Sequence, residues 1–181
     1  MHHELIIAGF GGQGIMFAGQ LLTYTGMMED RHVSYIPSYG PEMRGGTANC
    51  SVVISEKEIG SPIVTDPGIL VTLNQPAFDK FAPTVKDGGL IIYNSTLING
   101  ELPGEDVETL AVPASKIADE LGNPRITNMV MLGALIKKTQ MVSLETILDS
   151  LEKVLPEHRH NLIPLNKQAL EAGMEYTEDK L

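Results

Sequence analysis

The sequence is poor in the residues that many redox and hydrolytic sites require. Its 181 residues include one cysteine, Cys50, within a strand-like run. An iron–sulfur cluster needs about four thiolates, and a cysteine-rich zinc site also needs several. The spacing indicates no paired carboxylates, no His-x-x-x-His motif and no Ser-His-Asp arrangement. We therefore expect no metal ligands and no catalytic residues on this chain, and we expect Cys50 to be a small buried hydrophobic residue.

Positive charge and long apolar runs are also scarce. The chain has 13 Lys and Arg against 23 Asp and Glu, a net charge of −10, which argues against a nucleic-acid backbone as partner. No apolar run reaches the roughly 20 residues that span a bilayer. The N-terminus lacks the basic region and the small-residue cleavage site of a secretory signal. We expect a cytoplasmic protein with no membrane segment and no nucleic-acid partner.

A glycine motif near the N-terminus is the most informative feature that is present. Residues 5–8 form an apolar run typical of a buried strand, and Gly9, Gly11 and Gly14 follow at the spacing G-x-G-x-x-G. A helical apolar period begins at Ile15. The motif thus lies where a strand meets a helix, whose free N–H groups favour an anion. We interpret it as a phosphate-binding loop, with a ligand-free structural turn as the alternative.

Apolar runs alternate with helical periods along the chain, a pattern typical of βαβ units. We predict one α/β domain over residues 1–181, with a Rossmann-like, mostly parallel sheet flanked by helices and a helical C-terminal third. A run at 59–64 is expected to add an antiparallel strand beside the one before it. The predicted strands are 4–8, 32–37, 47–55, 69–73, 90–93 and 108–112, and the predicted helices are 12–26, 77–85, 114–121, 126–137, 144–155 and 165–173. We expect Gly26 and Gly122 to end the first and third of these helices and Ser143 to cap the fifth.

The loop at 39–46, Tyr-Gly-Pro-Glu-Met-Arg-Gly-Gly, is the second informative segment. The guanidinium of Arg44 matches a phosphate or a carboxylate, and a local ion pair with Glu42 is the alternative. In a doubly wound sheet the loops after the first and second strands lie side by side at the ligand crevice. A dinucleotide site would also need an acid at the tip of the second strand, and residues 36–39 contain none. NAD or FAD binding is therefore disfavoured.

Polar residues at four further positions have both functional and structural interpretations. Asn94 ends a predicted strand, so it points toward the edge of the expected crevice, although a turn role at a strand end is common for asparagine. Asn128 begins a predicted helix, where a capping or packing role is the alternative. His158 and His160 flank Arg159 near a helix end. For these we predict a solvated helix terminus rather than a metal site.

Several segments together carry a resemblance to a known family. The sequence resembles the gamma subunit of 2-oxoacid:ferredoxin oxidoreductases along nearly its whole length, and it is most similar to the 2-oxoglutarate branch, ahead of the ketoisovalerate, pyruvate and indolepyruvate branches. The segments are Gly9-Phe-Gly-Gly-Gln-Gly14, Tyr39-Gly-Pro-Glu-Met-Arg-Gly-Gly46, Leu73-Asn-Gln-Pro76, Asn128-Met-Val-Met-Leu-Gly133 and Leu165-Asn-Lys-Gln-Ala-Leu170.

The resemblance implies a subunit of a larger enzyme. In that family a 2-oxoacid, coenzyme A and oxidised ferredoxin give acyl-CoA, CO₂ and reduced ferredoxin. Thiamine diphosphate, magnesium and iron–sulfur clusters would lie on alpha, beta and ferredoxin-like delta partner subunits. The isolated chain should then be inactive. A free-standing NAD(P)-binding protein and a purely structural scaffold subunit remain as alternatives.

The resemblance also implies which residues approach coenzyme A as co-substrate. In the related single-chain enzymes the corresponding module contributes to the coenzyme A site. The glycine loop is the first candidate for the phosphates, Arg44 the next, and the two asparagines look like further contacts. The implied residues are Gly9, Gly11, Gly12, Gln13, Gly14, Arg44, Asn94 and Asn128.

Overall fold

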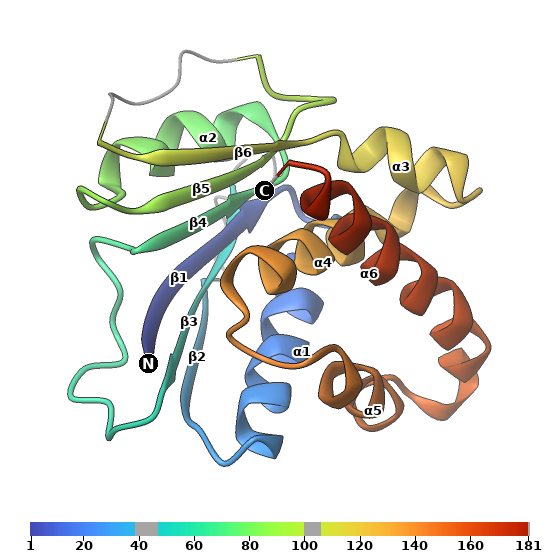
Figure 1. Cartoon of the computed structure of the whole chain (residues 1–181), viewed down its shortest axis with the longest axis horizontal. Coiled ribbons are helices and arrows are strands. Elements are labelled where there is room, and N and C mark those ends of the chain that lie inside the picture. Colours follow the sequence, from blue (N-terminus) through green and yellow to red (C-terminus); the bar gives the residue numbers. More distant parts are fainter. Residues whose placement is uncertain (39–46, 100–105, 181) are drawn as a thin grey trace.

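A computed structural model describes residues 1–38, 47–99 and 106–180. Six strands form one sheet in the order β2-β3-β1-β4-β5-β6, with helices on both faces (Figure 1). β1, β4, β5 and β6 run parallel, whereas β3 is antiparallel to both β1 and β2. The strands are β1 (His2–Gly9), β2 (His32–Ser38), β3 (Ala48–Ser55), β4 (Ile69–Thr72), β5 (Leu90–Asn94) and β6 (Glu108–Val112).

The helices divide unequally between the two faces of the sheet (Figure 1). α2 (Gln75–Phe81) and the short turn η2 (Ala82–Thr84) cover one face. Within the described ranges, no helix is long and apolar enough to cross a membrane. The other elements are α1 (Ile15–Met28), α3 (Ala114–Glu120), η3 (Pro124–Ile126), α4 (Thr127–Thr139), α5 (Leu144–Val154), η4 (Glu157–Leu162) and α6 (Ile163–Glu178).

Both faces of β1 are buried, as its uninterrupted apolar run predicts. Leu5 and Ile7 point into the larger core beneath α1, α4 and α6. Ile6 and Ala8 point into the smaller core, where they pack with Phe78 of α2. Since successive side chains of a strand alternate between faces, a strand with a core on each side needs apolar residues at every position.

Helix α4 lies in the middle of the larger core, with Thr127 through Ile136 all buried. It meets α6 where both helices carry glycine. A Cβ on Gly133 would collide with the carbonyl of Leu170, and a Cβ on Gly173 would collide with the carbonyl of Val130. The two backbones therefore touch directly, and this contact sets how α6 lies across α4.

Three details of the sequence prediction are wrong. Residues 59–64 lie outside the sheet, and the antiparallel strand is β3 itself. Because β3 returns between β1 and β2, the first two strands are not neighbours, although their carboxyl ends share one edge. Gly26 does not end the first helix, which continues to Met28. Its lack of a side chain lets Val33 and Ile54 pack closely against the helix.

Other local predictions are confirmed. Ser143 caps α5 by accepting a hydrogen bond from the Thr146 N–H, and Gly122 has the positive φ of 84° that ends a helix. Cys50 is fully buried on β3. Burial raises the pKa of its thiol to about 12, so the thiol stays protonated and inert.

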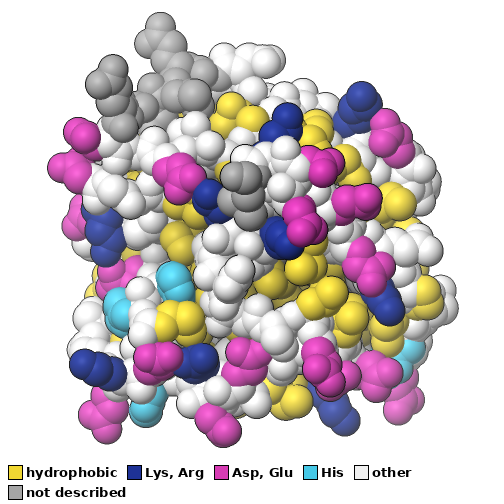
Figure 2. Space-filling model, viewed as in Figure 1, with side chains coloured by type: hydrophobic (Ala, Val, Ile, Leu, Met, Phe, Trp, Pro, Cys, Tyr) yellow, Lys and Arg dark blue, Asp and Glu magenta, His cyan; other side chains and the backbone are white. Residues whose placement is uncertain are grey.

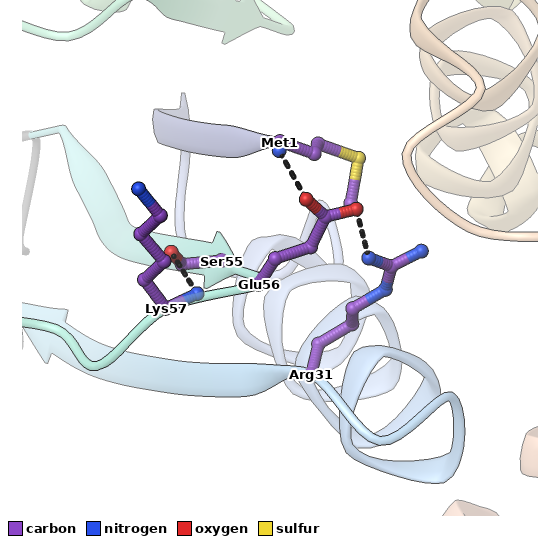
Figure 3. Close-up of polar contacts among 5 residues, drawn as sticks. All are labelled: Met1, Arg31, Ser55, Glu56 and Lys57. Atoms are coloured by element: carbon purple, nitrogen blue, oxygen red, sulfur yellow. Dashed lines mark hydrogen bonds and ion pairs between the residues drawn. The ribbon is translucent and has the colours of Figure 1, made fainter.

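The amino ends of the parallel strands carry ion pairs. Glu56 accepts a hydrogen bond from the N-terminal amine of Met1 and another from Arg31 Nη1, both at 2.6 Å (Figure 3). Lys86 Nζ lies 2.9 Å from Glu4 Oε2 on β1. Elsewhere, acidic side chains are spread over the face seen in Figure 2, with Lys and Arg among them. The amino end is thus held by charges that neutralise one another.

Candidate functional site

The glycine loop connects the carboxyl end of β1 to α1 as a compact turn. The Gln13 N–H donates to the Phe10 carbonyl at 3.2 Å, and the Phe10 N–H donates to Gln13 Oε1 at 2.7 Å. Gly12 and Gly14 have φ angles of 93° and 73°, which lie in the left-handed region that glycine alone adopts at little cost. The sequence prediction of a strand–turn–helix motif is confirmed here.

Gly9, Gly12 and Gly14 differ in what surrounds them. A Cβ on Gly9 would crowd the side chains of Gln13 and Leu73, so Gly9 allows close packing at the strand end. A Cβ on Gly14 would collide with the Asn128 amide of α4. A Cβ on Gly12 would meet no atom of the described residues within 4 Å. With respect to those residues, the backbone at Gly12 is the part of the loop that is open to a ligand.

The N-terminus of α1 has the features of an anion site. Gly14 precedes it, no side chain caps it, and its first turn contains no acid. Asn74 caps α2 and Ser143 caps α5, whereas α3, α4 and α6 share with α1 the lack of a side-chain cap. A groove of about 290 Å³ lies against this turn, between Phe10, Gly12, Phe17 and the start of β3 at Ala48. The helix dipole and the first N–H groups can both act on a negative group placed there.

Side-chain amides hold the loop and the strand ends together. Asn74 Nδ2 donates to Gln13 Oε1 at 3.1 Å, while Asn74 Oδ1 accepts the Ala77 N–H at 2.9 Å. Asn128 Nδ2 donates to the Gly14 carbonyl at 3.1 Å. These bonds tie the glycine loop to both α2 and α4. The arrangement fixes the loop before any ligand arrives, which lowers the entropic cost of binding.

The predicted site residues differ in how they are placed. Gln13 belongs to the glycine loop and Asn128 of α4 contacts it, while their contact with coenzyme A stays a prediction. Asn94 is fully buried, and its amide bonds to the Leu73 carbonyl and to both the Oγ and the N–H of Ser115. Its direct contact with coenzyme A stays a prediction. Arg44, with the rest of the loop at 39–46, lies outside the described residues, so its role also stays a prediction.

Two arginines that the motif analysis did not select border the same region. A second cavity, of about 410 Å³, begins at Gly14 and Phe17 and is lined by Arg125 of η3 and Arg159 of η4. A third, of about 240 Å³, is lined by Gly12, Gln13, Arg125 and Asp119, among others. Sequence inspection placed Arg159 only at a helix terminus, because nothing local shows that η3 and η4 line one cavity.

Of the two histidines that flank Arg159, His160 has a structural role. A ring nitrogen of His160 lies 2.9 Å from the Leu155 carbonyl, which fixes the turn that carries Arg159. His158 is exposed. Over the described ranges, no group of three or more His, Cys, Asp or Glu is placed to hold a metal ion.

Comparison with known proteins adds a family. The family model described as pyruvate ferredoxin/flavodoxin oxidoreductase matches residues 4–176. A ketoisovalerate oxidoreductase subunit VorA from Methanothermobacter thermautotrophicus is 42% identical over 97% of this chain, but the chain spans 36% of that relative's length. A 2-oxoglutarate synthase subunit KorC from Methanocaldococcus jannaschii is 40% identical and covers 92% of both chains. The same sequence unit thus occurs within a longer subunit and as a separate one.

Solved structures show the same fold. A keto/oxoacid ferredoxin oxidoreductase gamma subunit from Geobacter sulfurreducens superposes with a TM-score of 0.84 at 28% identity, covering 98% of this chain and 99% of that one. A 2-oxoglutarate:ferredoxin oxidoreductase from Magnetococcus marinus, with 2-oxoglutarate, coenzyme A and succinyl-CoA bound, gives a TM-score of 0.88 at 23% identity. It covers 98% of this chain and 31% of that one. The second likeness concerns the fold alone.

Proposed function

The chain belongs to the pyruvate ferredoxin/flavodoxin oxidoreductase family, and from this membership we propose that it acts as the gamma-type subunit of a 2-oxoacid:ferredoxin oxidoreductase. The assembled enzyme would convert a 2-oxoacid, coenzyme A and oxidised ferredoxin into acyl-CoA, CO₂ and reduced ferredoxin. The observation that carries the proposal is the match along nearly the whole of both chains to a separate subunit of such an enzyme.

Within that enzyme we assign this chain to coenzyme A. The glycine loop supports the assignment, because its open backbone at Gly12 and the uncapped start of α1 suit a phosphate group. Gln13 and Asn128 would act by holding the loop in shape. Arg44 and Asn94 stay in the proposed site as candidates. Thiamine diphosphate, magnesium and iron–sulfur clusters would be held by alpha, beta and delta subunits.

Reconstitution of the enzyme from its subunits tests the proposal, and we expect these subunits to occur together in the cytoplasm. The full chain would be assayed alone and after co-purification with its partner subunits, with an electron acceptor and with 2-oxoglutarate, ketoisovalerate or pyruvate. We expect no turnover from the chain alone and coenzyme A-dependent turnover from the assembly, with 2-oxoglutarate preferred. Turnover by the isolated chain, or co-purification without a thiamine-binding pair, would contradict the proposal.

A titration separates the coenzyme A assignment from the alternatives. The full chain on its own would be titrated with coenzyme A and, separately, with NADH. Binding of coenzyme A alone supports the assignment. Binding of NADH alone would support an NAD(P)-binding protein, and binding of neither would support a scaffold subunit.

A further inference from the structure

We propose that Arg125 and Arg159 form a second phosphate-binding subsite, continuous with the glycine loop, which recognises the 3′-phosphate of the adenosine end of coenzyme A. The inference rests on the proposed function, and it names the residues that distinguish this ligand from nucleotides lacking that phosphate. Its starting point is a shared cavity: Gly14, Phe17, Arg125 and Arg159 line one hollow of about 410 Å³.

The two guanidinium groups are available for a ligand. Neither forms an ion pair with any described residue, whereas Arg31 at the far end of the sheet lies 2.6 Å from Glu56. No Asp or Glu of the described ranges lines the 410 Å³ cavity. In a chain with ten more acids than bases, two arginines line one acid-free hollow and leave a positive charge with no ion-pair partner among the described residues, although Asp119 lines the third cavity beside Arg125. A phosphate dianion would neutralise it.

The backbone holds both arginines in place although their side chains are exposed. The Arg125 N–H donates to Asn123 Oδ1 at 3.0 Å, which fixes η3. The Arg159 N–H donates to the Pro156 carbonyl at 2.8 Å, which fixes η4. The arginines come from distant parts of the sequence, and the packing of α4 and α6 sets where their turns lie.

The other polar groups in the cavity are weaker candidates for the phosphate. Asn128 already donates its amide to the Gly14 carbonyl at 3.1 Å, and Asn166 donates its amide to the Leu162 carbonyl at 2.8 Å. The guanidinium groups therefore supply the strong donors that have no partner among the described residues. Their fork of N–H groups matches the geometry of phosphate oxygens.

The cavity's position relative to the glycine loop favours a ligand with two separate phosphate groups. Gly14 and Phe17 line both the groove at α1 and the arginine cavity. Gly12 lines the groove and the third cavity, and Arg125 lines the third cavity and the second. Coenzyme A carries a pyrophosphate and a ribose 3′-phosphate. The pyrophosphate fits the loop by the dipole argument, and the 3′-phosphate fits the arginines.

The test compares coenzyme A with dephospho-coenzyme A in the assembled enzyme. The variants are Arg125→Gln, Arg159→Gln and their double variant, with Arg159→Lys to keep the charge and remove the fork. Lys57→Gln is the matched control, since it removes one exposed positive charge beside Glu56, at the far end of the sheet (Figure 3). KM for each ligand and kcat would be measured at one salt concentration, because screening weakens exposed charges.

We expect the wild-type enzyme to favour coenzyme A, and each glutamine variant to reduce this preference by about tenfold, the lower range for a hydrogen bond to a charged group. The preference of the Arg159→Lys variant should lie between those of the wild type and the Arg159→Gln variant, and kcat should not change. Lys57→Gln should keep the full preference. An assembly that turns over normally yet keeps its preference in the double variant would overturn the subsite and leave the proposed function standing.

A second measurement judges the subsite without turnover. The full chain would be titrated with adenosine 3′,5′-bisphosphate and with AMP. Tighter binding of the bisphosphate that is lost in the double variant supports the subsite even if no 2-oxoacid is consumed, in which case the proposed function alone fails. Equal binding of the two nucleotides, or equal loss in Lys57→Gln, would overturn the subsite.

Discussion

At the amino ends of the parallel strands, charged side chains pair with one another near solvent, whereas at the carboxyl ends neutral amides bond to the main chain. At the amino ends, Glu56 forms ion pairs with the N-terminal amine of Met1 and with Arg31. Asn74, Asn94 and Asn128 satisfy carbonyl and N–H groups at the second. These three amides hold the carboxyl end without using charged groups, so its helix N-terminus and its nearby arginines remain able to attract an anion.

The comparison separates two ways of holding a strand end. Exposed ion pairs contribute little to stability and are weakened by salt. Removing a buried amide lowers stability more, because the main-chain groups that it leaves behind are desolvated and unpaired. The end with the candidate site should therefore be the more sensitive of the two to substitution.

Asn94→Ala should produce the largest loss. It removes the amide that bonds to Leu73 and Ser115 within a fully buried site, so we expect unfolding to become easier by about 3 kcal/mol. Urea denaturation of the full chain measures this. Asn99→Ala is the matched control, because Asn99 is exposed and should change stability by less than about 0.5 kcal/mol. A loss at residue 94 no greater than that at residue 99 would remove the distinction between the two ends.

The second prediction compares two glycines with the same φ. Gly14 and Gly88 both have a φ of 73°, but Gly14 touches Asn128 at the carboxyl end, and a Cβ on Gly88, in the turn before β5, would meet no described residue within 4 Å. We expect Gly88→Ala to cost about 1 kcal/mol of strain. Gly14→Ala should cost about 2 kcal/mol because a collision is added to the strain.

Enzyme kinetics extend the same comparison. In the assembled enzyme, Gly14→Ala should raise KM for coenzyme A, because it displaces the loop at the start of α1, whereas Gly88→Ala should leave KM unchanged. If the two variants lose the same free energy of unfolding, backbone strain alone determines the loss and the collision with Asn128 adds nothing. A normal KM in a folded Gly14→Ala enzyme would argue against the loop as the phosphate site.

Local chemistry explains how much of this could be predicted from the sequence. The apolar run before Gly9 and the cap at Ser143 are determined by nearby residues, and both were predicted. The insertion of β3 between β1 and β2 depends on pairing between distant strands, which alternation of side chains does not specify. The placement of Arg125 and Arg159 around the same cavity likewise depends on how the helices pack in three dimensions. The sequence therefore identified the loop but not the arginines beside it.

The smallest expected effect concerns the charged end and its pH dependence. Hydrogen bonds from the N-terminal amine and then from Arg31 lower the pKa of Glu56 below its usual 4.5. A carboxylate with a lowered folded-state pKa stabilises the protein above its unfolded value and loses that contribution as the pH falls through the folded value. Glu56→Gln should therefore lower Tm slightly near neutral pH, and its Tm should converge with that of the wild-type protein below pH 4.5.

Thermal unfolding of both proteins across this range measures the effect, with Glu58→Gln as the matched control because Glu58 is exposed and forms no ion pair with a described residue. The control should follow the wild-type curve. High salt should also shrink the difference between Glu56→Gln and the wild type, since the pairs are accessible to solvent. A difference that persists at low pH and in high salt would mean that Glu56 acts through packing rather than charge, and the contrast between the two ends would then not be electrostatic.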